Sequence, residues 1–255
     1  MTMQRREAGL AVLGMLVGLM SALLGIGGGL LLIPALVVFY HQTMRIASGI
    51  SLVTMWPVIV AGAVASSVLS PQSLQVLVVS LIIAGAFFGT FLGTRCEHRL
   101  QNTVLLRLFA LLILAAGVLM TLPRGVFSGV LPATKSLLFL VGVTTGFLSG
   151  FFGISGGVIL VPLLMLLGFP IHTATTTSLL ALVGIVFFSA GFHGLSGDIN
   201  YRVVAFLLPT ALLGSLIGSY YGAHAPALLL QGLFVIVLFV TAIRLLHVTR
   251  RVPAV

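Results

Sequence analysis

Hydrophobic residues along this chain fall into long runs, separated by short stretches that contain polar residues, glycine or proline. A membrane-spanning helix needs about 20 apolar residues, with about 17 as the lower limit. Eight of the runs reach this length, whereas two are too short to span a bilayer alone. The pattern predicts helices at residues 8–24, 30–39, 47–69, 74–94, 104–122, 136–152, 158–168, 174–195, 202–219 and 226–247.

The two short runs follow glycine-rich sequences that are nearly the same. Gly18 to Pro34 reads GLMSALLGIGGGLLLIP, and Gly146 to Pro162, 128 residues later, reads GFLSGFFGISGGVILVP. The repeat continues more weakly, since ASGISL (Ala47 to Leu52) matches ATTTSL (Ala174 to Leu179). A duplicated glycine break inside apolar helix is typical of secondary transporters, in which it places exposed backbone at the middle of the membrane.

The composition excludes the soluble classes of protein. Hydrophobic residues make up 60% of the chain and charged residues 6%, whereas a soluble domain carries about 25% charged residues. The formal net charge of +9 does not indicate a nucleic-acid partner, because the basic residues sit singly between apolar runs. We therefore expect one integral membrane domain over residues 1–255, of the all-α class, in contact with the lipid bilayer. Within it we expect a first repeat at 8–122, a linker at 123–135 and a second repeat at 136–247.

Two topologies are open for the short runs. Each can complete a single broken crossing with its predecessor, or the pair can form a re-entrant V that enters and leaves on one side. With the V and three full spans in each half, 10 of the 12 basic residues share one side with both termini, and only Arg124 and Lys135 lie on the other. Broken crossings reduce this split to about 8 to 4, and an excess of basic residues marks the cytoplasmic side. We therefore expect the V topology in a cell inner membrane, with both termini in the cytoplasm.

The V topology also fixes the relation between the halves. Three crossings are an odd number, so the second half enters the membrane from the opposite face. The predicted fold is a polytopic transmembrane helical bundle of two inverted repeats, each a re-entrant broken-helix V plus three spanning helices. This is the topology that supports alternating access.

The glycine clusters themselves suggest a binding site for an anion. GIGGG (Gly25 to Gly29) and GISGG (Gly153 to Gly157) disfavour helix, because each glycine costs about 1 kcal/mol relative to alanine. The helices that restart at Leu30 and Val158 present free N–H groups and positive dipole ends, which attract anions without a charged side chain. The alternative is that these glycines only permit close helix packing.

Hydroxyl side chains supplement the glycines as hydrogen-bond donors. The run from Thr175 to Ser178 is the densest cluster and could bind sulfonate-type oxygens. The alternative for any one hydroxyl is a bond to a carbonyl of its own helix. The candidates are Ser21, Ser48, Ser51 and Thr54 in the first half and Ser149, Ser155, Thr175, Thr176, Thr177 and Ser178 in the second.

The ionisable residues provide little for catalysis or ion coupling. All three acidic residues, Glu7, Glu97 and Asp198, fall at predicted cytoplasmic helix ends or loops, so a carboxylate proton relay is not expected. His193 is near the end of a predicted span and is interpreted as an interfacial polar residue. No His, Cys and Glu cluster has metal-ligand spacing. We therefore expect no metal, no cofactor and no catalytic residues.

The paired motifs, followed by ASGISL and ATTTSL, resemble the sulfite exporter TauE/SafE family over almost the whole chain. This resemblance implies a permease for sulfur-containing anions such as sulfite, sulfoacetate and other organosulfonates. It implies substrate-binding roles for Gly27, Gly28, Gly29, Ser51, Ser155, Gly156, Gly157, Thr176, Thr177 and Ser178. The first half departs from the second, because Ser48-Gly49-Ile50 stands where the second half has Thr175-Thr176-Thr177.

These observations favour a membrane exporter of a small sulfur-containing anion, working by alternating access. Each anionic charge that leaves a negative cell interior gains about 2.3 kcal/mol per 100 mV, so export needs no co-ion. The main alternative is a passive anion channel. A membrane enzyme and a purely structural membrane partner are weaker alternatives, and a homodimer is compatible with the sequence.

Overall fold

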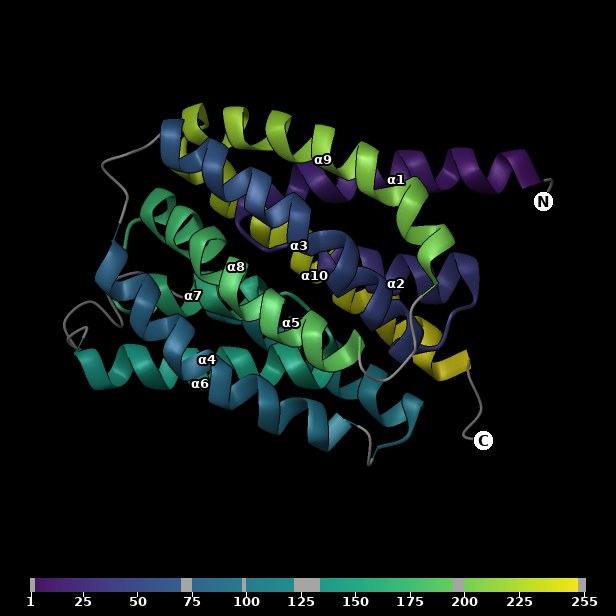
Figure 1. The fold of residues 1–255 in the computed structure, drawn as a ribbon, viewed down its shortest axis with the longest axis horizontal. Helices are drawn as coiled ribbons and strands as arrows, with labels where there is room; N and C mark the ends of the chain where they lie inside the picture. The colour runs from purple at the N-terminus through teal and green to yellow at the C-terminus, as the bar shows by residue number, and fades with distance from the viewer. Residues whose placement is uncertain (1–2, 70–74, 98–99, 122–133, 195–199, 252–255) are drawn as a thin grey trace.

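The computed structural model describes residues 3–69, 75–97, 100–121, 134–194 and 200–251, which form an all-α bundle (Figure 1). Ten helices and no strands are present in these ranges. Their bounds are α1 (Met3–Leu24), α2 (Gly29–Tyr40), α3 (Met44–Leu69), α4 (Val76–Glu97), α5 (Asn102–Thr121), α6 (Lys135–Phe152), α7 (Gly157–Leu166), α8 (Ile171–Gly194), α9 (Tyr201–His224) and α10 (Ala227–Arg251).

Each predicted helix has a counterpart in the structure, and the differences lie at the ends. Helix α9 continues to His224, beyond the predicted end at residue 219. Tyr220 and Tyr221 are less apolar than the residues before them, yet both lie within the helix. The predicted linker at 123–135 lies outside the described residues up to residue 133. Its last two residues belong to α6, since Lys135 begins the helix and the Thr134 side chain accepts a hydrogen bond from the Leu137 N–H. This is an ordinary N-cap.

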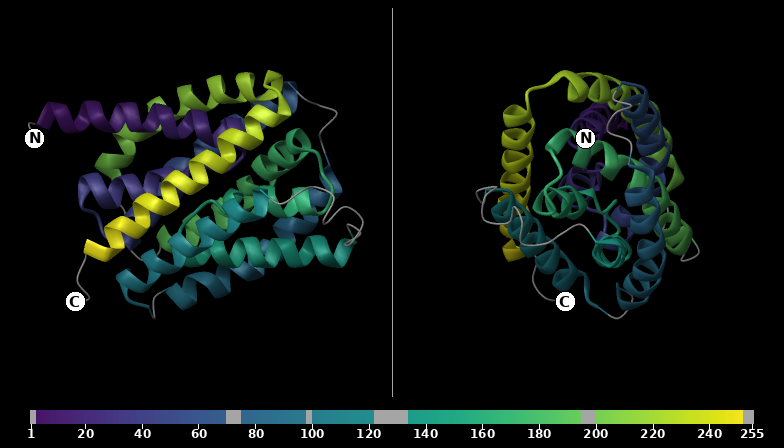
Figure 2. Two further views of the ribbon diagram at one scale, coloured as in Figure 1. Left: turned by 180° about the vertical axis from the view of Figure 1, so that it is seen from behind. Right: turned by 90° about the vertical axis from the view of Figure 1, so that its left-hand side faces the viewer.

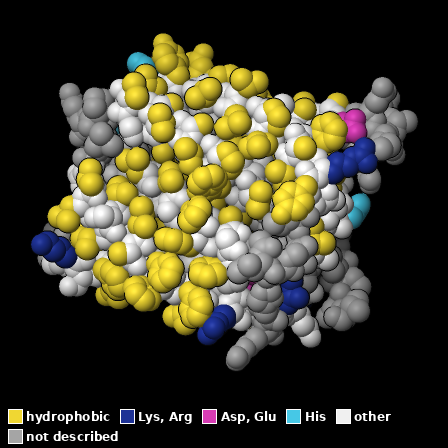
Figure 3. All heavy atoms as spheres, in the orientation of Figure 1, with side chains coloured by type: hydrophobic (Ala, Val, Ile, Leu, Met, Phe, Trp, Pro, Cys, Tyr) yellow, Lys and Arg dark blue, Asp and Glu magenta, His cyan; other side chains and the backbone are white. Residues whose placement is uncertain are grey.

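Eight of the described helices are long and apolar enough to cross a membrane, whereas α2 and α7 have 12 and 10 residues. Figure 3 shows hydrophobic side chains covering the middle of the visible face, with the basic groups toward its edges. An exposed apolar surface of this extent requires lipid rather than water around it. The chain is therefore a multi-pass membrane protein.

Glycines allow the two closest pairs of helices to pack backbone against backbone. Gly85 of α4 packs against the backbone of Phe139 on α6, and Gly93 packs against Phe147. The contacts advance in the same direction along both helices, so α4 and α6 run parallel. Small residues four apart let backbones approach in lipid, so these glycines permit the close packing of α4 on α6.

The same arrangement joins α1 to α9. Gly214 of α9 packs on Met15 of α1, and Gly218 packs on Leu19, so these helices are also parallel. Gly18, the first glycine of the first repeated motif, lies against the Ala211 backbone of α9. The outer glycines of the motifs therefore serve helix packing, whereas the inner ones shape the chain breaks.

Contacts between side chains give the direction of α3 and α8. The Ser215 hydroxyl of α9 donates to the Val58 carbonyl at 2.9 Å, and Ser219 donates to Gly62 at 3.2 Å, so α3 and α9 run parallel. The rings of Phe87 on α4 and Phe188 on α8 lie 5.1 Å apart, and those of Phe91 and Phe192 lie 5.8 Å apart, so α4 and α8 also run parallel. One group of parallel helices therefore contains α1, α3 and α9, and the other contains α4, α6 and α8. Figure 1 shows the two groups running in opposite directions.

Both glycine clusters interrupt the helix, as the sequence predicts. The chain leaves α1 at Leu24 and begins α2 at Gly29, with left-handed backbone at Gly25, Gly27 and Gly28 (φ of 68°, 74° and 75°). In the second half, Gly153 and Gly156 are left-handed between α6 and α7 (φ of 66° and 83°). Only glycine adopts this conformation without strain. The short helices that follow are mostly buried, with the longer helices around them in the end-on view of Figure 2.

Candidate functional site

The two glycine breaks contact each other in the core of the bundle. The Ser155 hydroxyl of the second break donates to the Ile26 carbonyl of the first at 2.8 Å. The Ser178 hydroxyl of α8 donates to the Gly25 carbonyl at 2.9 Å. Gly157 packs directly on the backbone of Gly25 and Ile26, where any side chain would collide. The fold therefore brings two segments about half a chain apart into one buried polar region.

Helices α2 and α7 begin in this region without a side-chain cap. Gly28 and Gly156 are the N-cap residues, and neither start has a side-chain hydrogen bond. Because a helix start leaves several N–H groups without an intrahelical partner, these starts offer backbone donors and positive dipole ends. The sequence predicted this donor type, and the structure adds that the two helix starts adjoin.

Each break also packs against the long helix that comes after the short helix of the other half, α8 for the first break and α3 for the second. A Cβ atom on Gly25 would lie 2.9 Å from the Thr175 Cα atom, and Gly153 packs on Ser48. The Ser48 hydroxyl donates to the Phe152 carbonyl at 2.9 Å. Ser48 and Thr175 hold matching places in the two repeats, so the contact occurs twice with different hydroxyl residues.

Several buried hydroxyls near the core have no hydrogen-bond partner among the described residues. The group consists of Ser21, Ser51, Thr54, Thr90, Thr145 and Thr177. Leaving a buried hydroxyl unpaired costs about 1–3 kcal/mol. The Ser51 hydroxyl lies 3.1 Å from the place of a Cβ atom on Gly29, whereas Thr145 presents its methyl group to Gly156. The start of α2 therefore has an unpartnered hydroxyl next to it, which a polar ligand would satisfy, and the start of α7 lies beside a residue whose hydroxyl is also unpartnered.

The predicted binding residues divide into four groups in the structure. Ser155 and Ser178 hold the breaks together through carbonyls, whereas the buried hydroxyls of Ser51 and Thr177 lack partners. Thr176 instead lines a separate polar pocket of about 20 Å³ with His172. This volume holds about one water molecule. The remaining residues form the break backbones and are Gly27, Gly28, Gly29, Gly156 and Gly157.

Sequence reasoning did not select Thr145. It lies four residues before Ser149 on α6, so both side chains share one face of the helix. The Ser149 hydroxyl was among the candidates, and it donates to the Ile154 carbonyl inside the second break. A search of the same helix face for further hydroxyls would have found Thr145.

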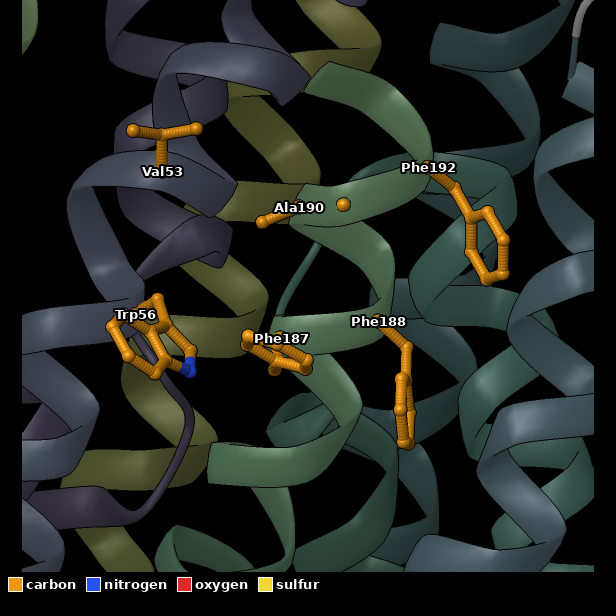
Figure 4. Close-up of a pocket in the computed structure, with 7 residues that line it drawn as sticks. Val53, Trp56, Phe187, Phe188, Ala190 and Phe192 are labelled. Atoms are coloured by element: carbon orange, nitrogen blue, oxygen red, sulfur yellow. The ribbon is translucent and has the colours of Figure 1, made fainter. Parts of the chain in front are cut away.

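A larger cavity of about 470 Å³ lies between α3 and α8, and Figure 4 draws its lining. Its walls are formed by Val53, Trp56, Phe187, Phe188, Ala190, Gly191 and Phe192. The indole Nε1–H of Trp56 points across to the Val183 carbonyl at 3.1 Å. Because the walls carry no charge and almost no polar surface, this cavity does not suit an anion. Trp56 is packed against Phe187, with ring centroids 5.7 Å apart.

The structure pairs two ionisable residues that the sequence analysis treated separately. Glu97, expected at a helix end or loop, is the last residue of α4, and its side chain is only 2% exposed. His193, interpreted as an interfacial residue near the end of its span, is buried, with its Nε2 atom 2.8 Å from Glu97 Oε2. The parallel packing of α4 against α8 brings the two side chains together. Their wide separation in sequence gave no sign of the pair.

A bundle of membrane-crossing helices around paired, uncapped helix starts defines a membrane transporter. Within the described ranges no group of three or more histidine, cysteine or acidic residues could hold a metal ion. The chain belongs to the sulfite exporter TauE/SafE family, whose model matches residues 2–120 and 137–254. This is a family of transporters, so the chain is not an enzyme.

Curated relatives agree with this class. A "probable membrane transporter protein" of Methanocaldococcus jannaschii is 26% identical, covering 80% of both chains. The "probable membrane transporter protein YunE" of Bacillus subtilis is 27% identical over 82% of this chain and 86% of its own length. A "probable membrane transporter protein" of Xylella fastidiosa is 29% identical over 85% of this chain and 82% of its own. No solved structure matches the chain.

Proposed function

We propose that this protein is an inner-membrane carrier that exports a small sulfur-containing anion, such as sulfite or an organosulfonate, by alternating access. The observation that carries the proposal is the contact between the two glycine breaks, where two uncapped helix starts and buried, unpartnered hydroxyls adjoin. Backbone N–H groups and hydroxyls are donors that bind oxyanions without a fixed positive charge. Membership of the family supports a sulfur-containing anion as the substrate.

The directions of the helices support two inverted repeats within a single membrane domain. Helices α1 and α3 are parallel, so α2 between them runs back, and together α1 and α2 form a V. The parallel pair α6 and α8 implies the same for α7. Matching helices of the two halves, such as α1 and α6, run in opposite directions. We assign the repeats to 8–122 and 136–247, joined by a linker at 123–135.

The distribution of basic residues supports an orientation with both termini in the cytoplasm. The end of the bundle that contains the start of α1 and the end of α10 is called the arginine-rich end here. The basic residues of the described helices at this end are Arg5, Arg6, Arg45, Arg95, Arg107, Arg202, Arg244, Arg250 and Arg251. At the opposite end, Lys135 is the described counterpart. An excess of basic residues on the cytoplasmic side is the usual rule.

The proposed anion site consists of donors from both halves. Backbone comes from Gly27, Gly28, Gly29, Gly156 and Gly157, and hydroxyls come from Ser51, Ser155, Thr177 and Ser178. Thr176, also expected from the sequence, lines the separate small pocket and is left out of the proposed site. Ser155 and Ser178 now donate to carbonyls, so they would turn from these carbonyls to the anion as the breaks part. Such an exchange of partners links binding to movement of one half against the other. The direct contact between the breaks favours a carrier over a passive channel, which needs a continuous opening.

Transport by the purified protein in proteoliposomes tests the proposal. The anion panel is sulfite, sulfate and sulfoacetate, with taurine as a zwitterionic comparison. A carrier gives saturable flux of sulfite or sulfoacetate and faster release when the same anion is present on the opposite side. An inside-negative potential should accelerate export, because each anionic charge gains about 2.3 kcal/mol per 100 mV. Flux that rises linearly with concentration would indicate a channel, and no flux or binding with any member would overturn the proposal.

A further inference from the structure

A buried acid–base pair joins the two halves near the arginine-rich end. Glu97 ends α4 in the first half, and His193 lies one residue before the end of α8 in the second. The His193 Nε2 and Glu97 Oε2 atoms are 2.8 Å apart, and the side chains are 7% and 2% exposed. Burying ionisable groups this far is costly unless they are paired. The proposed anion site uses neither residue.

The surroundings of the imidazole specify how many protons the pair holds. His193 Nδ1 lies 3.1 Å from the Ser189 carbonyl, which can only accept a hydrogen bond, so Nδ1 carries a proton. The Nε2 and Oε2 atoms are close without the alignment of a regular hydrogen bond. Because two lone pairs at this distance repel each other, the contact favours a second proton, held either by the imidazole or by the carboxyl group. Both arrangements are neutral overall. Each contains one proton more than a neutral histidine beside an ionised glutamate.

Ser189, whose backbone carbonyl contacts His193, is linked to the second glycine break through its side-chain hydroxyl. The Ser189 hydroxyl lies 2.9 Å from the Ser149 hydroxyl. Ser149 in turn donates to the Ile154 carbonyl, within the GISGG segment. The residue that accepts from His193 is therefore two hydrogen bonds from the backbone of the proposed anion site.

Other charged groups around the pair are engaged elsewhere or lie away from it. On α3, the Arg45 guanidinium donates to the Leu100 carbonyl at 3.2 Å. On α4, Arg95 stacks over the Phe91 ring at 4.1 Å. Lys135 of α6 and His172 of α8 belong to the opposite ends of their helices, Arg107 of α5 is exposed, and Arg202 of α9 lies 3.5 Å from Glu7 of α1. His98 and Arg99 lie outside the described residues.

We propose that His193 and Glu97 form a proton-binding site that is coupled to anion binding at the glycine breaks, an inference that rests on the proposed function. One proton from water adds at Nε2 or Oε2 and converts the pair from a net charge of −1 to neutral. An anion in the nearby breaks is repelled by the deprotonated pair and not by the neutral one. Anion binding therefore favours proton uptake, and by linkage the proton strengthens anion binding by the same factor. Imidazole is suited to this because its charge changes near neutral pH.

Calorimetry on the purified full chain counts the protons. Sulfoacetate is titrated in two buffers of different ionisation enthalpy, because its sulfonate and carboxylate both stay ionised between about pH 6 and about pH 8. We expect proton uptake on binding and, by linkage, an affinity that weakens as the pH rises. E97Q and H193Q should remove both effects, and E97Q should keep the high affinity because it mimics the protonated acid. Binding without proton uptake in the wild type would overturn the inference, as would normal uptake in both variants.

The chain offers a matched control and a readout that needs no anion. Glu7 forms the other acid–base contact described at this end, 3.5 Å from Arg202 and partly exposed, so E7Q should behave as wild type. Cys96 is the single cysteine of the sequence, is exposed and precedes Glu97. An environment-sensitive dye on Cys96 should respond to pH near neutrality in wild type and E7Q, but not in E97Q or H193Q. If no anion in the panel binds, the proposed function and the coupling both fall. In that case the dye measurement tests only whether His193 and Glu97 bind a proton. Equal responses in all four proteins would overturn the proposed proton-binding site.

Discussion

The hydroxyl of Ser155 donates a hydrogen bond of 2.8 Å to the carbonyl of Ile26, although 129 residues separate them in sequence. The bond joins the glycine break of one half to that of the other. It also occupies a hydroxyl that would otherwise be free for a ligand. The two breaks are therefore one structural unit, and a change in either should affect both stability and anion binding.

Ser155→Ala removes this bond and leaves the buried Ile26 carbonyl without its partner. We expect a loss of about 1–3 kcal/mol of unfolding free energy, measured by thermal unfolding in detergent with and without sulfoacetate. The matched control is Ser67→Ala, because Ser67 donates at 2.7 Å to Ala63 within its own helix. Equal destabilisation by the two changes would show that the bond between the halves contributes no more to the free energy of unfolding than a hydroxyl bond within one helix.

Thr177→Val tests whether the unpartnered hydroxyl of Thr177 contributes to ligand binding. Thr177 is fully buried without a partner among the described residues, so the isosteric valine should leave the ligand-free protein equally stable or more stable. Sulfoacetate affinity should fall about fivefold to tenfold if one hydrogen bond worth about 1 kcal/mol is lost. Thr90→Val is the control, since Thr90 is equally buried and unpartnered but is not part of the proposed site. Unchanged affinity in Thr177→Val would remove this residue from the site.

Gly89→Ala tests the glycine contact between α4 and α6. An added methyl group would collide with the Val143 carbonyl and the Phe147 backbone. We expect a loss of about 1–3 kcal/mol or failure to fold, because backbone cannot move aside as a side chain can. Gly232→Ala is the control on α10, where nothing lies within 4 Å of the new atom. It should be neutral or gain up to about 1 kcal/mol from helix propensity, and thermal unfolding compares the two proteins.

Trp56 provides a built-in probe of movement between the halves. It is the only tryptophan in the sequence, and its Nε1–H bridges from α3 to the Val183 carbonyl of α8. Alternating access should alter this contact, so sulfoacetate binding should change the tryptophan emission in proportion to site occupancy. Trp56→Phe must abolish the signal. Constant emission while calorimetry records binding would mean that α3 and α8 move together.

The helices and their interruptions could be predicted because they depend on local chemistry. The length of an apolar run decides whether a helix can cross lipid, and the consecutive glycines from Gly27 to Gly29 disfavour helix regardless of their neighbours. The end of α9 was placed too early, because Tyr220 and Tyr221 are less apolar than the residues before them although the helix continues through both.

The candidate site could be predicted only in part. The glycines and Ser155 were found because the motif occurs twice. Thr145 was missed, because its importance depends on its neighbour Gly156 rather than on its own repeat partner, Val17. The buried pair of Glu97 and His193 was missed for a similar reason, since each looks like a polar residue at a helix end.

By itself the sequence determined that this chain lies in a membrane, that it is helical, that it breaks twice at glycine and that it belongs to a transporter family. These properties follow from transfer free energies and backbone conformations that act within a few residues. Only the tertiary structure decided that the two breaks contact each other and which hydroxyls donate hydrogen bonds to them. It also decided that Glu97 at the end of α4 lies against His193. Such contacts depend on the direction and register of helices packed in three dimensions, and no local pattern encodes either.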